Sequence, residues 1–157
     1  MNHAFASAIA PCDEFEDQRV REAIRLLELD PDAELTCAYC GNSAETWDHI
    51  FATVRKSQFS GYGHRLGNLL PCCKPCNSRK GNKSWEVYLE TLPLPEAARE
   101  RRSECIRRFL AKYSVLDPIN PNDPDLGELE GLRTEILRLM ARADTIATRI
   151  RSRQAAP

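Results

Sequence analysis

Apolar residues recur at intervals of three and four in three long stretches of the chain, which is the spacing of one face of an α-helix. The stretches run from 13 to 29, from 96 to 113 and from 125 to 153. Prolines stand close to the ends of these stretches and limit them, because a residue before proline disfavours the helical conformation. The pattern therefore predicts a chain that is mostly helical.

The chain ahead of the first stretch has no such periodicity. We expect residues 1–12 to be loosely ordered. Asp13 follows, with Glu16 three residues later, and this pair has the spacing of a capping box. The sequence thus predicts that the first helix starts with Asp13 as its N-cap.

Shorter elements are predicted between the first and second helices. Residues 45–50 alternate and are rich in β-forming side chains, and residues 68–70 read as a second strand, so we expect a hairpin. Residues 51–67 contain three glycines and would form a mobile connection. A short helix is expected over 75–80, where proline suits the first turn, and another after Ser84, which can cap it.

The predicted elements give an α+β fold that is mostly helical and divide the chain into five parts. Three prolines between 114 and 124 predict a stiff linker that separates the last helix from the rest. The parts are an N-terminal helical segment (1–34), a central segment with most of the cysteines (35–92), a packing helix (93–113), the linker (114–124) and an amphipathic heptad helix (125–157).

The last helix carries a regular heptad pattern. Its a and d positions are apolar: Leu129, Leu132, Ile136, Leu139, Ala143, Ile146 and Ile150. The residues just before the a positions are acidic in the first half, Glu128 and Glu135, and basic in the second, Arg142 and Arg149. An antiparallel pair of such helices sets each acid opposite a base, whereas a parallel pair sets like charges at the same level. We expect an antiparallel homodimer or a partner protein here, with packing on residues 13–29 and 96–113 as the alternative.

Charge is distributed unevenly along the chain, although the net charge of the 157 residues is −1. Residues 1–35 hold 3 Lys and Arg against 9 Asp and Glu, whereas residues 36–85 hold 7 against 2. A local basic region of this kind attracts phosphate groups. The pI of about 6.3 argues against strong non-specific coating of nucleic acid.

The seven cysteines and the absence of long apolar runs indicate the compartment. An odd number, with four cysteines in two x-x-spaced pairs, favours metal ligation in a reducing cytosol over disulfides. No apolar run approaches the roughly 18 residues of a membrane span, and the N-terminus has no basic region typical of a secretory signal. We expect a cytoplasmic protein without a membrane partner.

Two Cys-x-x-Cys pairs, Cys37/Cys40 and Cys73/Cys76, predict a structural zinc site. Zn²⁺ prefers four soft ligands in a tetrahedron, and each pair supplies two thiolates at chelating distance. Cys72 competes with Cys73, but it would break the knuckle spacing to Cys76. We therefore expect Zn²⁺ on the four paired cysteines, and binding of this metal to stabilise the surrounding fold.

The segment between and around these cysteines resembles the HNH endonuclease family. The resemblance covers about residues 35–83 and rests on Cys37-Ala-Tyr-Cys40-Gly41, Asp48-His49-Ile50, Asn68-Leu69-Leu70-Pro71 and Cys73-Lys-Pro-Cys76-Asn77-Ser-Arg-Lys80-Gly81. It implies a ββα-metal core with zinc knuckles, flanked by an N-terminal helix and C-terminal helices. It further implies hydrolysis of phosphodiester bonds in DNA, most simply double-stranded DNA.

The resemblance also implies roles for single residues. Asp48 and Asn77 would bind a catalytic Mg²⁺ or Mn²⁺ through oxygen, the ligand that such hard cations prefer. His49 would be the general base, and Asn68 would brace the hairpin. Nearby basic residues would contact phosphates: Arg65, Arg79, Lys80 and Lys83.

One departure and several minor assignments complete the interpretation. Many family members have histidine where this chain has Asn77. We expect Trp47 to pack in the core and Cys12 to be buried, and we interpret His64 as an exposed loop residue rather than a substrate contact. The alternatives to a stand-alone nuclease are a nuclease effector subunit directed by a larger partner and a catalytically silent zinc-finger module that binds nucleic acid.

Overall fold

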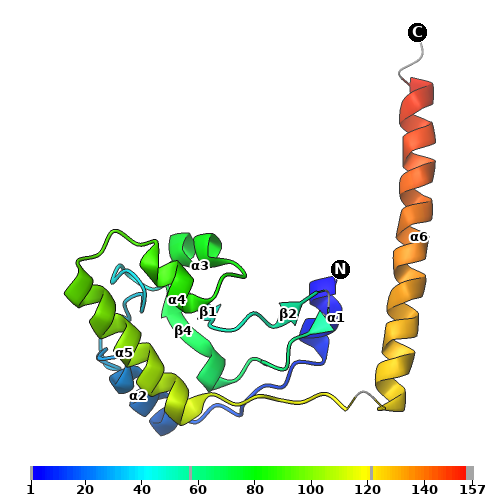
Figure 1. Cartoon of the computed structure of the whole chain (residues 1–157). Coiled ribbons are helices and arrows are strands. Elements are labelled where there is room, and N and C mark those ends of the chain that lie inside the picture. The colour runs from blue at the N-terminus through cyan, green and yellow to red at the C-terminus, as the bar shows by residue number, and fades with distance from the viewer. Residues whose placement is uncertain (1, 57, 121, 155–157) are drawn as a thin grey trace. The chain divides into compact units, whose positions relative to one another are not determined.

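The computed structural model describes residues 2–56, 58–120 and 122–154 (Figure 1). The described chain has an α+β fold with helices over about half of its length, and it forms two compact units that divide after residue 118. Four of the five predicted parts include residues that lie outside the described ones, namely 1, 57, 121 and 155–157.

An antiparallel pair of strands lies at the centre of the first unit, as the sequence predicts. Strand β1 (Thr46–His49) pairs with β4 (Leu69–Cys72), with Thr46 opposite Cys72 and His49 opposite Leu69. Helix α3 (Lys74–Lys80) follows β4 directly and has Pro75 in its first turn. Two strands and a helix thus occur in the order expected of a ββα unit.

The connection between β1 and β4 contains more regular structure than the sequence predicts. Strands β2 (Val54–Arg55) and β3 (Gln58–Phe59) form a second, small antiparallel pair. A 3₁₀ turn, η1 (Leu66–Asn68), leads into β4. A Cβ atom on Gly67 would lie 1.9 Å from the backbone oxygen of Tyr113, so only glycine fits at this contact.

Helices cover the central hairpin. Helix α2 (Asp17–Leu26) and α5 (Glu96–Tyr113) lie side by side in Figure 1, and α4 (Trp85–Glu90) packs on α5. The predicted cap of α4 is confirmed, because the Ser84 hydroxyl accepts a hydrogen bond from the Val87 amide. The expected bounds of the packing helix, 96–113, also match those of α5.

One apolar core connects these elements to the cysteines. The rings of Tyr39 and Tyr88 meet edge to face, with centroids 5.3 Å apart. Around them lie buried residues from the hairpin and from α4 and α5, among them Ile50, Leu70, Trp85, Leu89, Ile106 and Phe109. Because α5 supplies part of this core, the packing helix and the cysteine segment belong to the same unit.

The N-terminal region differs from the prediction. Residues expected to be loosely ordered contain helix α1 (Asn2–Ala8). Asp13 is not an N-cap, since α2 begins at Asp17 and the Asp13 carboxylate accepts hydrogen bonds from the Leu66 amide and the Arg65 guanidinium, each at 2.8 Å. The Asp13 carboxylate therefore bonds to the connection that precedes β4 and not to the first turn of α2.

Two side chains expected in the core are exposed. Trp47 is 43% exposed because it lies on the face of β1 opposite that of its buried neighbour Asp48. Cys12 is also exposed. The alternating sequence predicted that successive side chains of this strand point to opposite faces, but it did not predict which face packs against the core.

The second unit contains α6 (Pro124–Gln154), a helix of 31 residues. None of its described side chains is buried. The predicted linker does not belong wholly to this unit, because the Asp117 amide donates to the Gly61 oxygen at 2.7 Å within the first unit. Among the described helices, none combines the length and the apolarity that crossing a membrane requires.

Candidate functional site

Four cysteines converge on one point at the base of the hairpin. The sulfur atoms of Cys37, Cys40, Cys73 and Cys76 all lie within 4.8 Å of one another, and those of Cys40 and Cys73 are 3.6 Å apart. A zinc–sulfur bond of about 2.3 Å gives a tetrahedron with edges of roughly 3.8 Å. The predicted set of four cysteines is therefore confirmed as a group that can hold a metal ion, and its geometry is consistent with structural zinc.

Local backbone geometry brings each cysteine pair to this point. After the first pair the chain turns at Gly41, which has a φ of +84° and whose amide donates to the Cys37 oxygen. The second pair spans the start of α3, where Cys73 is the N-cap and Cys76 lies in the first turn. A tight turn and a helix start thus supply the two halves of the group.

Cys72 is close to the group but outside it. Its sulfur lies 3.9 Å from that of Cys37, and its side chain is fully buried at the end of β4. Burial raises the pKa of the Cys40 and Cys76 thiols, which disfavours their thiolate forms. A bound cation would reverse this preference, so metal binding and thiolate formation are coupled at this group.

A polar pocket of about 280 Å³ opens beside β1 and α3. It is lined by Asp48 and His49 from β1, Asn77 from α3, and His64 from the connection, with Ser7 of α1 at its edge. Three of these residues, Asp48, His49 and Asn77, are the ones for which the resemblance implied catalytic roles. Asp48 and Asn77, which are 29 positions apart in the chain, are therefore brought to a single cavity.

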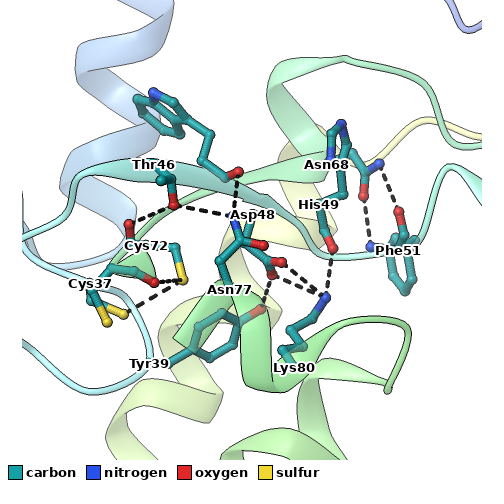
Figure 2. A network of polar contacts seen from close by, with 12 residues as sticks. Cys37, Tyr39, Thr46, Asp48, His49, Phe51, Asn68, Cys72, Asn77 and Lys80 are labelled. Carbon is teal, nitrogen blue, oxygen red and sulfur yellow. Dashed lines mark hydrogen bonds and ion pairs between the residues drawn. The ribbon is translucent and has the colours of Figure 1, made fainter. Parts of the chain in front are cut away.

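Asp48 is buried and fully engaged by side chains. It is 3% exposed, with the Lys80 ammonium 3.0 Å from one carboxylate oxygen and the Tyr39 hydroxyl donating to the same oxygen at 2.9 Å (Figure 2). Loss of hydration raises the pKa of Asp48, although the positive charge of Lys80 acts in the opposite direction. The carboxylate thus depends on Lys80 for its stability in the ionised form.

Lys80 has a different environment from the one the sequence suggests. Its side chain is 1% exposed, and besides Asp48 it donates to the backbone oxygen of His49 at 2.7 Å. An ammonium group in this position neutralises a buried acid and connects α3 to β1, whereas a phosphate contact would need it at the surface. The predicted contact of Lys80 with phosphate therefore does not fit its buried position.

His49 is held by a second histidine that sequence reasoning left without a role. Its Nε2 atom lies 2.9 Å from Nδ1 of His64, and Nε2 of His64 lies 3.0 Å from the Ser7 hydroxyl. Burial, together with the charges of His64 and Lys80, lowers the pKa of His49 to about 4. The imidazole of His49 is therefore neutral near pH 7. No local pattern indicated this contact, because the glycines around His64 predicted a mobile connection.

Asn68 connects the end of β1 to the start of β4 through its side-chain amide. Its Oδ1 accepts from the Phe51 amide at 2.8 Å, and its Nδ2 donates to the backbone oxygens of Phe51 and Gly63, each at 3.0 Å. These three bonds fix the chain just after His49 to the chain just before β4. Asn68 therefore acts on the position of His49 through the backbone and does not line the pocket itself.

Asn77 faces the pocket from α3. Its Nδ2 donates to the Thr46 hydroxyl at 3.1 Å and to the Trp47 oxygen at 3.2 Å. Both bonds use the amide nitrogen and leave the side-chain oxygen outside these two contacts. The orientation of this amide is set by its two acceptors.

The predicted phosphate contacts fall into two groups. Arg79 and Lys83 are exposed at the end of α3 and just beyond it, and Lys83 donates to the Arg79 oxygen. Arg65 is instead bound by Asp13 at 2.8 Å and by Asp117 at 2.6 Å, and these bonds raise its pKa further. Two carboxylates neutralise its charge, so Arg65 holds the N-terminal region and the start of the linker on the first unit.

The described chain thus contains a four-cysteine group and a pocket whose lining includes one acid, two histidines and two asparagines. Comparison with known protein families, with curated proteins and with solved structures gave no match. Function is therefore inferred from the residues and their geometry.

Proposed function

We propose that the chain is a metal-dependent endonuclease of the HNH type that hydrolyses phosphodiester bonds in DNA. The observation that supports this proposal is the meeting of Asp48, His49 and Asn77 in one pocket between a ββ hairpin and the following helix. A nucleic-acid-binding module has no need of an acid, a base and an amide in one cavity. Such a set is typical of hydrolysis assisted by a metal ion.

The pocket offers ligand atoms of the kind that a hard divalent cation prefers, but one of its ligands already has an ion-pair partner. The oxygens of Asp48 and Asn77 are donors of the kind that Mg²⁺ and Mn²⁺ prefer. The Asp48 carboxylate, however, is paired with Lys80, so it can bind a cation only where the cation replaces the ammonium as its partner. When bound, the cation would stabilise negative charge on the phosphate and on the leaving oxygen.

The remaining residues act on a proton and on the substrate. His49 is neutral near pH 7 because its pKa is lowered to about 4, so its ring can accept a proton from the attacking water. In the tautomer in which Nε2 of His49 donates its proton to Nδ1 of His64, Nδ1 of His49 is the accepting atom. Arg79 and Lys83 are exposed beside the pocket and would attract the phosphates that flank the cleaved bond.

A second candidate is a catalytically silent zinc module that binds nucleic acid. The buried ion pair between Asp48 and Lys80 favours it, because this pair occupies the carboxylate that a catalytic cation would need. Such a protein would bind DNA through its exposed basic residues and leave the strands intact. The two candidates therefore differ in cleavage and not in binding.

Cleavage of supercoiled plasmid by the purified, zinc-loaded chain tests the proposal. We expect nicking or cutting with Mg²⁺ or Mn²⁺ and a loss of at least about a hundredfold in His49→Ala, since a general base contributes on that scale. Glu86→Gln, an exposed change on α4, is the matched control and should cut as the parent does. Unchanged cutting by His49→Ala contradicts the mechanism, and DNA binding without cutting by the parent chain supports the silent module.

A further inference from the structure

Helix α6 presents a wide apolar stripe that no described residue of the second unit covers. Seven of its large apolar side chains are between 39% and 51% exposed: Leu132, Ile136, Leu137, Leu139, Met140, Ile146 and Ile150. All of them except Leu137 and Met140 occupy a and d positions of the heptad, which share one face of the helix. An exposed face of this length on a soluble helix marks an interaction surface.

The charges that flank this stripe are complementary to those of a second, antiparallel copy of the helix. Glu128 and Glu135 precede a positions in the first half of α6, and Arg142 and Arg149 precede them in the second half. When a second copy of the helix runs in the opposite direction, this edge of each helix meets the same edge of the other. Every acid then faces a base, although each helix carries both signs.

We propose that α6 forms an antiparallel homodimer with α6 of a second copy of this chain. In the register that aligns these charges, Glu128 faces the partner's Arg149, and Glu135 faces the partner's Arg142. The same register sets Ile136 opposite the partner's Leu139, and Leu132 opposite the partner's Ala143. Ile136 therefore packs against a large side chain and Leu132 against a small one, and both pairs allow close packing.

The residues on the other edge of the stripe, at the e positions, also fit this register. The e positions are Leu126, Arg133, Met140 and Ala147, of which three are apolar. In the antiparallel pair Leu126 lies beside the partner's Ala147, so this edge widens the apolar contact while the other edge carries the charges. In a parallel pair Ala143 would meet its own copy and leave a gap, and Glu135 would lie level with its own copy.

Self-complementarity is the reason to name a second copy as the occupant. A two-fold interface requires that each surface patch match itself, and the reversal of charge about the middle of α6 meets that requirement. A different partner protein would impose no such symmetry on this helix. The inference rests on α6 alone and does not depend on the proposed nuclease function.

The mass of the full chain in solution, measured by sedimentation equilibrium, tests the inference. The parent chain should be a dimer. Arg142→Glu with Arg149→Glu makes all four flanking charges acidic, so we expect dimerisation about a hundredfold weaker, because four attractive contacts become repulsive. Adding Glu128→Arg and Glu135→Arg restores opposite charges in the antiparallel register only, so this fourfold variant should be a dimer again.

A matched control has the same change in net charge away from the stripe. Arg138→Glu with Arg151→Glu lies at outer heptad positions and should leave the dimer intact. A monomeric parent chain overturns the proposal. It is also overturned if the Arg142/Arg149 variant remains dimeric, or if the fourfold variant stays monomeric while circular dichroism shows the parent's helix content.

Discussion

The first unit and α6 are stabilised in opposite ways. In the first unit the decisive contacts join distant parts of the chain, such as Asp48 with Lys80 and Arg65 with Asp117. In α6 the hydroxyl contacts are local, since Thr134 and Thr145 donate to backbone oxygens four residues earlier. A single change in the first unit therefore reaches the site, whereas α6 depends on what covers its stripe.

Length alone does not make α6 a stable element. An isolated helix in water is marginal, and most helical stability in proteins comes from packing of the apolar face. Gly127 and Gly131 weaken its first turns further. The comparison thus predicts a first unit that unfolds as a whole and a second whose order follows its association.

Removal of the bound metal should produce the largest difference in stability between the first unit and α6. Chelation, or Cys76→Ser, removes a folding contribution of about 10 kcal/mol or more for a structural zinc site. The first unit should lose its tertiary near-ultraviolet signal, including that of buried Trp85, while α6 keeps its helical signal. Metal analysis of the parent should give about one zinc per chain. A zinc-free chain with an unchanged tertiary signal would contradict the four-cysteine site.

Asp48→Ala should have the next largest effect. It leaves the ammonium of Lys80 buried without its carboxylate, which costs about 3–5 kcal/mol. Combining it with Lys80→Met removes both charges and should recover much of the loss. Urea unfolding of the two single variants and the double variant measures this coupling. Additive losses in the double variant would show that the two side chains do not interact as described.

Two glycine substitutions sharpen the comparison further. Gly67→Ala places a Cβ atom 1.9 Å from the Tyr113 oxygen, so α5 must move and the first unit should lose about 1–3 kcal/mol. Gly131→Ala is the matched change in α6, where a Cβ atom meets nothing within 4 Å. It should instead stabilise the helix by about 1 kcal/mol. Thermal unfolding followed by circular dichroism should show opposite shifts, and equal shifts would contradict the contrast.

The smallest predicted effect concerns acid. Burial alone would raise the pKa of Asp13, but hydrogen bonds from Arg65 and the Leu66 amide outweigh it and lower that pKa. The ionised form therefore stabilises the first unit above the unfolded pKa of about 3.9, and this contribution is lost as pH falls through the lower folded value. Asp13→Asn should lose stability at neutral pH and lose less on acidification. Urea midpoints at pH 7 and pH 3 check this, and parallel losses would contradict it.

Local pattern predicts much of the fold and little of the polar network. The β1–β4 hairpin, α3, α5 and the four cysteines follow from spacing within short segments. Asp13 had the local pattern of a cap, but a guanidinium 52 residues away takes its carboxylate. Lys80 and His64 were visible only as polar residues, because their roles depend on burial against β1 that no local pattern encodes.

The contact between Gly67 and Tyr113 has a consequence for synthesis of the chain on the ribosome. All four cysteines of the group have been synthesised once Cys76 is added, whereas Tyr113, whose backbone oxygen lies against Gly67, is added only at the end of α5. We expect a nascent chain to be able to hold a metal ion first and to fix the turn at Gly67 later. The order of synthesis therefore places the four-cysteine group ahead of the contact that closes α5 on the start of β4.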